Sequence, residues 1–137
     1  MIPHLRVAAG ILEDADGRFL IAERLGDGPF HGMWEFPGGK IGTDESAHAA
    51  LIRELDEEIG ISVVDASLFT SLDHRYPDRR VSIDFFLVTH WRGEARGCEG
   101  QALRWLRADE LENANLLPAD APVVTKLKAR QKRRATG

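Results

Sequence analysis

The sequence predicts a single α/β (α+β) domain in which helices cover a mixed β-sheet. The chain has 137 residues, enough for one ordinary domain and too few for two cores with a linker. Its composition, 43% hydrophobic and 29% charged, allows a buried core and excludes a disordered or collagen-like chain. The expected strands and helices interleave without a regular βαβ alternation, which favours a mixed sheet over a Rossmann fold.

The first third of the chain is expected to be mainly extended. Residues 5–12 form an apolar run that resumes at residues 19–22, and the Asp16-Gly17 pair between them predicts a β-hairpin. Residues 26–29 have the composition of a loop. Residues 34–36 predict a short strand, which the Pro-Gly-Gly sequence after it should end.

The clearest predicted helix spans residues 45–59, where neither Gly nor Pro occurs. Thr43 or Asp44 can cap its N-terminus, and Gly60 occupies the position where a left-handed residue ends a helix. One arc of this helix is apolar and is expected to pack into the core: Leu51, Ile52, Leu55 and Ile59.

The second half predicts further strands followed by two helices. Extended segments at 67–74 and 81–91 are expected to pair antiparallel through a turn at 76–79. A strand at 103–106, a short helix at 108–111 and a final helix from Pro122 to about Lys132 should complete the domain.

Charge is distributed unevenly along the chain. The formal net charge is −4, yet the segment from Lys126 onward holds Lys and Arg with no Asp or Glu, so the remainder is strongly acidic. The acidic balance argues against nucleic acid as a stable partner. Cys98 is the single cysteine, and no apolar run approaches the roughly 20 residues that span a bilayer. We therefore expect a cytoplasmic protein without a membrane partner.

Three carboxylates share one face of the predicted helix. Glu54, Glu57 and Glu58 are spaced i, i+3 and i+4, so they lie within about 100° of arc. They repel one another, and they lie near the helix C-terminus, where the helix dipole also disfavours anions. A divalent cation would remove both penalties, and oxygen ligands suit Mg²⁺ or Mn²⁺.

The spacing around these carboxylates resembles the Nudix box over residues 39–61. It comprises Gly39, five residues, Glu45, seven residues, Arg53-Glu54-Leu55, one residue, Glu57-Glu58, one residue and Gly60-Ile61. The resemblance implies an α/β/α sandwich around a mixed sheet. It also implies Mg²⁺-dependent hydrolysis of a nucleoside diphosphate linked to another group.

Further stretches resemble the MutT-type members of that family. They are residues 34–40, 76–79, 99–101 and 118–123. This resemblance implies a single domain over residues 1–137, acting as a monomer that hydrolyses 8-oxo-dGTP to 8-oxo-dGMP and pyrophosphate. Such an enzyme removes an oxidised nucleotide before it enters DNA.

The same resemblance implies a set of metal ligands. They are Glu54, Glu57, Glu58, Glu99 and the main-chain carbonyl of Gly38. The implied metal is Mg²⁺, with Mn²⁺ as an alternative. Either Glu54 or Glu99 could take the proton from the attacking water, and the sequence does not choose between them. Glu45 and Arg53 are expected to support the site structurally, Arg53 through an i, i+4 contact with Glu57.

Other residues are candidates for binding the nucleoside triphosphate substrate. Arg24 and Lys40 would bind the phosphates. The base pocket is expected to lie away from the metals. Phe36, Leu5 and Arg79 would form its walls, and Asp120 would recognise the base.

Asp120 departs from the MutT pattern, which has Asn at this position. An Asn accepts a hydrogen bond from N7–H of 8-oxoguanine and donates to O6, whereas an ionised Asp only accepts and would repel O6 unless protonated. An Asp would also accept from the amine of cytosine. A pyrimidine nucleotide pyrophosphohydrolase is therefore the enzymatic alternative. The alternative of another class is a non-catalytic Nudix nucleotide-binding module, although such modules commonly lose the box glutamates that this chain retains.

Overall fold

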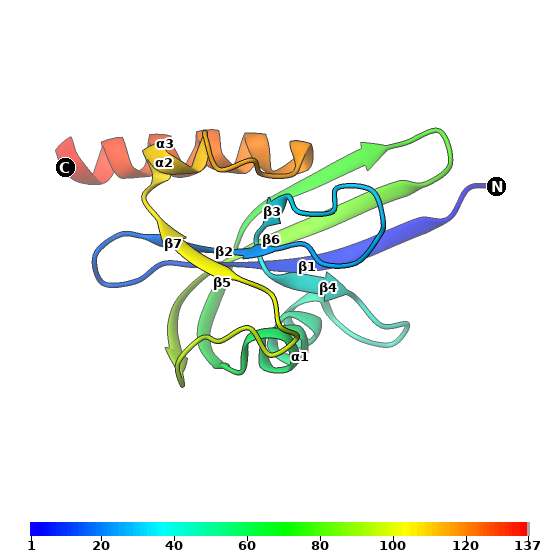
Figure 1. Ribbon diagram of the computed structural model, residues 1–137, viewed down its shortest axis with the longest axis horizontal. Helices are drawn as coiled ribbons and strands as arrows, with labels where there is room; N and C mark the ends of the chain where they lie inside the picture. Colours follow the sequence, from blue (N-terminus) through cyan, green and yellow to red (C-terminus); the bar gives the residue numbers. More distant parts are fainter. Residues whose placement is uncertain (137) are drawn as a thin grey trace.

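The computed structural model describes residues 1–136 and contains two small sheets between helices (Figure 1). The strands are β1 (His4–Leu12), β2 (Phe19–Glu23), β3 (Trp34–Glu35), β4 (Gly38–Lys40), β5 (Ser62–Arg75), β6 (Arg80–Arg92) and β7 (Leu103–Leu106). The helices are α1 (Ala47–Ile59), α2 (Ala108–Leu111), the 3₁₀ turn η1 (Pro118–Asp120) and α3 (Ala121–Thr136). None of the described helices is long and apolar enough to cross a membrane.

The larger sheet is mixed, as the sequence predicts. Its strand order is β4-β1-β6-β5, with β1 parallel to β6 and the other pairs antiparallel. The second sheet has the order β3-β2-β7. In Figure 1, α1 lies on one side of the strands, and α2 and α3 lie on the other. This arrangement is the α/β/α sandwich expected from the resemblance.

Two apolar cores separate the strands from the helices. Ile11 and Ile21 pack with Leu127 of α3, whereas their neighbours Leu12 and Leu20 pack with α1. Successive side chains of a strand point to opposite faces, so one β-strand supplies both cores. The sheets are therefore covered on both faces, which fixes α1 against them.

Helix α1 begins later than the sequence suggests. Its N-cap is Ser46, whose side chain accepts a hydrogen bond from the amide of Ala49, and not Thr43 or Asp44. Residues 42–45 form a turn instead, because the amide of Glu45 donates to the carbonyl of Gly42. The predicted end is confirmed, since Gly60 is left-handed with φ of 70°.

Ile52 is a second departure on α1. It is 38% exposed, whereas Leu51, Leu55 and Ile59 are fully buried as expected. Position 52 lies at the margin of the apolar arc, where the helix turns toward solvent.

Two β-strand predictions are also corrected. The β1 and β2 strands share only one bridge, Glu13 to Phe19, because β1 joins the larger sheet and β2 the smaller one. The predicted short strand is present as β3 and ends before Pro37, but the Gly-Gly-Lys segment that follows forms a separate strand, β4, against β1, which was not predicted. A strand of two glycines and a lysine lacks the β-branched residues that indicate a strand in sequence.

Candidate active site

A pocket of about 200 Å³ opens between the strands and the C-terminal end of α1. Its walls come from β2 and the residues after it, from the β3–β4 segment, from α1 and from the loop before β7. The lining residues are Ala22, Glu23, Arg24, Leu25, Glu35, Pro37, Gly38, Glu58, Glu99 and Gln101. Four of the predicted site residues, Arg24, Gly38, Glu58 and Glu99, therefore meet at one place.

Glu54 lies next to this pocket, directly against β4. A Cβ atom on Gly39 would overlap the Glu54 carboxyl group, so only glycine leaves room for that side chain. The Nη1 atom of Arg53 donates to Glu54 Oε1 at 2.8 Å, which fixes the orientation of the carboxylate.

Arg53 and Glu45 form the support for this acidic face, as predicted. Arg53 donates to both carboxylate oxygens of Glu45, at 2.8 and 2.9 Å, and to the carbonyl of Lys40 at 3.0 Å. The hydrogen bonds from Arg53 and from the amide of Gly42 lower the pKa of Glu45 to about 2. The pair thus ties α1 to β4 and to the turn before the helix.

Glu58 is the most perturbed acid on α1. Burial, together with the charges of Glu54, Glu99 and Glu35, raises its pKa to about 8. The amide of Gly38 donates to its Oε2 at 3.3 Å and only partly offsets this effect. Several carboxylates therefore converge on Glu58 without enough positive charge to balance them.

Such a donor set suits a hard divalent cation, because it is built from carboxylate oxygens whose mutual repulsion a cation would relieve. Among residues 1–136, however, no group of three or more His, Cys, Asp or Glu side chains is already arranged closely enough to hold a metal ion. Glu54 and Glu58 are held instead by Arg53 and by the amide of Gly38. Both carboxylates would have to exchange or share these partners to bind a metal ion.

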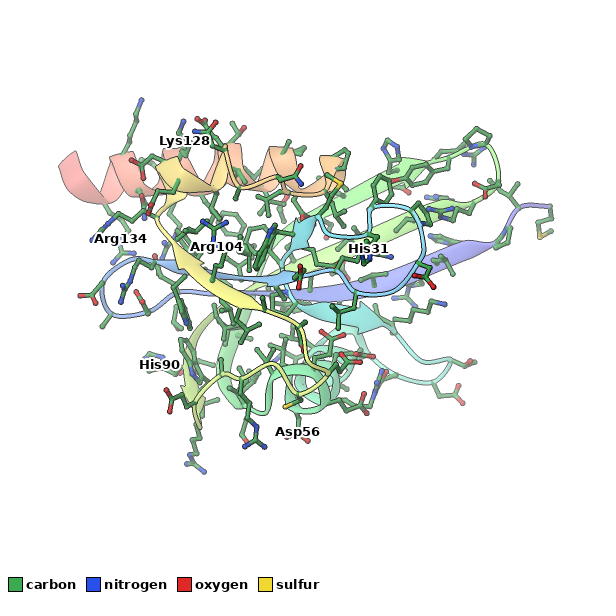
Figure 2. All side chains as sticks on the ribbon, viewed as in Figure 1. His31, Asp56, His90, Arg104, Lys128 and Arg134 are labelled. Carbon is green, nitrogen blue, oxygen red and sulfur yellow. The ribbon has the colours of Figure 1, made fainter. Side chains whose placement is uncertain are left out.

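Glu57 lies at the outer edge of the acidic face. Its side chain is 58% exposed and contacts Arg53 Nη1 at 3.4 Å, so the predicted i, i+4 contact is present. Asp56, the preceding residue, lies on the outer surface of α1 (Figure 2).

The loop that carries Glu99 is attached to the end of α1. The amides of Arg96 and Cys98 donate to the carbonyls of Ile59 and Glu58, each at 3.0 Å. These bonds satisfy carbonyls that the helix itself leaves unpaired. They bring Glu99, 41 positions further along the chain, beside Glu58.

The two candidate phosphate-binding residues have different surroundings. Arg24 lines the pocket, and its Nη1 atom lies 3.2 Å from Glu35 Oε1. Lys40 is exposed at the end of β4 and is not among the lining residues. The structure thus joins Arg24, but not Lys40, to the acidic pocket.

Asp120 is buried, with 4% of its surface exposed. Its Oδ2 atom has no hydrogen-bond partner within residues 1–136. Burial, and secondarily the charge of Glu35, raises the pKa of Asp120 to about 8. Its carboxyl group is therefore mainly protonated at neutral pH.

The predicted pocket walls are not brought into the acidic pocket. Phe36 is buried in the core on the α3 side, where its ring meets that of Phe85 edge-on at 6.1 Å between centroids. Arg79 lies in the turn between β5 and β6, with its guanidinium 4.6 Å from the centre of the Tyr76 ring.

The pocket lining also includes residues that were not predicted, and Glu35 and Gln101 are the two whose contacts shape the site. Glu35 lines the pocket and raises the pKa of both Glu58 and Asp120, while its own pKa is raised by burial despite the nearby Arg24. Gln101 is buried beneath Glu99. Both lie inside the MutT-like stretches, but residue type alone gave neither a role.

Comparisons with known proteins agree with this geometry. Residues 3–127 match the NUDIX domain family. The chain is 40% identical to the 8-oxo-dGTP diphosphatase of Escherichia coli K12 over 124 residues, covering 90% of this chain and 96% of that protein. It is 36% identical to the CTP pyrophosphohydrolase of the same organism over 120 residues, covering 88% of each.

A solved MutT structure supports the same assignment. It comes from a study of the Aliivibrio salmonicida and Vibrio cholerae proteins and superimposes with a TM-score of 0.79 at 36% identity. The superposition covers 91% of this chain and 96% of that one. The chain therefore belongs to the NUDIX domain family and is a MutT-like Nudix hydrolase.

Proposed function

We propose that this chain hydrolyses 8-oxo-dGTP to 8-oxo-dGMP and pyrophosphate and so removes an oxidised nucleotide from the DNA precursor pool. Support comes from the 40% identity to an 8-oxo-dGTP diphosphatase over 90% of the chain. The observation that carries the choice of base is Asp120, a buried carboxyl group with an unpartnered oxygen and a pKa raised to about 8.

Protonation of Asp120 removes the repulsion that an ionised carboxylate would exert on O6 of 8-oxoguanine. The protonated carboxyl group donates through O–H and accepts through its other oxygen, as the amide of Asn does. It can therefore donate to O6 of 8-oxoguanine and accept from N7–H. Phe36 and Arg79 would border the base beside it.

Nudix hydrolases in general depend on divalent metal ions, and we propose Mg²⁺, with Mn²⁺ as a substitute, for this chain. Glu54, Glu57, Glu58, Glu99 and the carbonyl of Gly38 would hold it. The raised pKa of Glu58 supports the proposal, because, after burial, the charges of Glu54, Glu99 and Glu35 contribute to it and a cation would relieve their repulsion. When bound, Mg²⁺ lowers the pKa of water and offsets phosphate charge.

The residues of the chain then supply orientation and proton transfer. Glu54 or Glu99 would accept the proton from a water molecule that attacks the β-phosphorus. A new bond forms between the water oxygen and the β-phosphorus, and the bond from that phosphorus to the oxygen that bridges the α- and β-phosphates breaks. The nucleoside monophosphate leaves with that oxygen, and the other product is pyrophosphate. Arg24 and Lys40 would bind the triphosphate, and Arg53 would hold Glu54 in place.

Hydrolysis of a pyrimidine nucleotide is the second candidate. The CTP pyrophosphohydrolase similarity favours it, as does an acidic residue at position 120, which could accept from the amine of cytosine. A panel of 8-oxo-dGTP, dGTP, CTP and dCTP with Mg²⁺ distinguishes the two. Our proposal predicts the highest kcat/KM for 8-oxo-dGTP, and a preference for CTP or dCTP would replace it with the alternative.

A non-catalytic nucleotide-binding module is disfavoured, because Glu54, Glu57 and Glu58 are all retained. The same panel tests it, since a binding module would bind nucleotides without turnover. We further propose a single domain over residues 1–137 that acts as a cytoplasmic monomer without a stable nucleic-acid partner. Sedimentation of the protein alone tests whether it is a monomer, and sedimentation with added DNA tests whether it lacks a stable nucleic-acid partner.

A further inference from the structure

Gln101 joins the backbones of two acidic residues of the pocket. Its Oε1 atom accepts a hydrogen bond from the amide of Glu99 at 2.9 Å. Its Nε2 atom donates to the carbonyl of Glu58 at 3.0 Å. Gln101 is only 8% exposed, and both bonds are partly buried. The Gln101 side-chain amide therefore connects the loop to Glu58 of α1, a residue 43 positions earlier in the chain.

The surrounding loop is shaped around this amide. The amide of Gly100 donates to the carbonyl of Gly97 at 3.0 Å and closes a tight turn that contains Glu99. A Cβ atom on Gly97 would overlap the main-chain carbonyl of Gln101, so the turn can approach this closely only with glycine there. The carbonyl of Glu58 also accepts from Cys98, so the loop and Gln101 hold the same helix residue.

The chemistry of the two bonds requires a carboxamide. The Glu99 amide needs an acceptor, and the Glu58 carbonyl, which already accepts from the Cys98 amide, takes a second donor; one Gln side chain supplies both groups. An apolar residue of similar length would leave the partly buried Glu99 amide without its acceptor, which is costly, and would remove one of the two donors to the Glu58 carbonyl. The loop would then lose the hydrogen bond that the Glu99 amide makes.

We propose that Gln101 is a positioning residue that sets the place of Glu99 relative to Glu58. This inference rests on the proposed function, because it assumes that the two acids act on one metal ion and one substrate. Residues that orient metal ligands typically affect metal affinity or activity by about 10- to 100-fold when mutated. Gln101 would act in this way through the backbones of both acids, without touching the substrate.

The test compares Gln101→Met with Gln131→Met. Gln131 is the matched control, because its Nε2 atom donates to the carbonyl of Gly17 at 3.2 Å, away from the pocket. Binding of Mn²⁺ without nucleotide is measured by electron paramagnetic resonance, and kcat and KM are measured with Mg²⁺. For Gln101→Met we expect Mn²⁺ affinity and kcat each to fall by roughly 10-fold, with KM for the nucleotide changed little. Gln131→Met should match the wild type.

A Gln101→Met protein that folds and keeps wild-type Mn²⁺ affinity and kcat overturns the inference. Failure of the wild type to bind Mn²⁺ or hydrolyse any nucleotide overturns the proposed function instead. If Gln101→Met does not fold, nuclear magnetic resonance of the wild type decides the question. The Gln101 side-chain amide should exchange slowly and shift on addition of Mg²⁺, while that of Gln131 does not shift. Rapid exchange without a shift at Gln101 overturns the inference.

Discussion

The carboxyl group of Asp120 lies close enough to that of Glu35 for the charge on Glu35 to add to burial in raising the Asp120 pKa. Glu35 is in turn paired with Arg24 and lines the acidic pocket. The residue proposed to recognise the base is thus electrostatically connected to the wall of the pocket proposed to bind phosphates. Its protonation state becomes a property that experiments can follow.

The first prediction concerns stability and pH. The folded chain keeps the Asp120 proton up to about pH 8, whereas the unfolded chain loses it near the ordinary value of 3.8. Unfolding between these values releases a proton, so the group lowers the free energy of unfolding as pH rises. Asp120→Asn removes this loss and should be more stable than the wild type by at least about 1 kcal/mol at pH 8. Urea denaturation between pH 5 and pH 9 measures it, and a difference independent of pH would contradict the assigned pKa.

The second prediction concerns activity. Above about pH 8, ionised Asp120 would repel O6 of the base. We expect kcat/KM for 8-oxo-dGTP to fall there in the wild type more steeply than in Asp120→Asn, because the amide does not titrate. Pyrophosphate release between pH 6 and pH 9.5 measures both profiles. Parallel profiles would mean that Asp120 does not contact the base through a titrating oxygen.

The third prediction tests the proposed metal ligands on α1. Glu57→Gln should lower Mg²⁺-dependent kcat by roughly 100-fold, as expected for the loss of a group that stabilises transition-state charge. Asp56→Asn is the control, since it makes the same change of charge one residue away on the outer surface of the helix. Circular dichroism checks that both proteins fold. Equal activity of Glu57→Gln and Asp56→Asn would remove Glu57 from the metal site.

The fourth prediction tests the contact between β4 and the acidic face. In Gly39→Ala, the new methyl group would displace the Glu54 carboxylate from its place beside Arg53. We expect kcat to fall by at least about 10-fold. Gly28→Ala adds the same methyl group where nothing lies within 4 Å and should behave as the wild type. A fully active Gly39→Ala enzyme would show that Glu54 need not occupy this position.

Local sequence patterns predicted the elements whose causes are local. The periodic apolar residues and Gly60 identified α1 and its end, and the strand at 103–106 and the helix at 108–111 were predicted with the observed bounds. The start of α1 was placed too early, because several residues before it can cap a helix and Ser46 is the one that does. The strand errors arose where tertiary pairing decides. Strand β4 exists because β1 offers it an edge, and β1 separates from β2 because β6 pairs with β1.

The residues of the candidate site also divide into those that local sequence or resemblance predicts and those that depend on contacts between distant segments. Helical spacing placed Glu54, Glu57 and Glu58 together, family resemblance supplied Glu99 and Asp120, and the need for a cation to bind phosphate suggested Arg24. The roles of Glu35 and Gln101 depend on contacts between distant segments, so neither is visible in spacing or composition. The raised pKa of Asp120 likewise comes from burial, which a sequence does not show.

The most direct test of the account is the rate of pyrophosphate release from 8-oxo-dGTP and from dGTP by the purified protein with Mg²⁺. We predict a clearly higher kcat/KM for 8-oxo-dGTP, with 8-oxo-dGMP and pyrophosphate as the products and loss of turnover when the metal is chelated. Equal or preferential hydrolysis of dGTP, or release of inorganic phosphate in place of pyrophosphate, would contradict the proposed function.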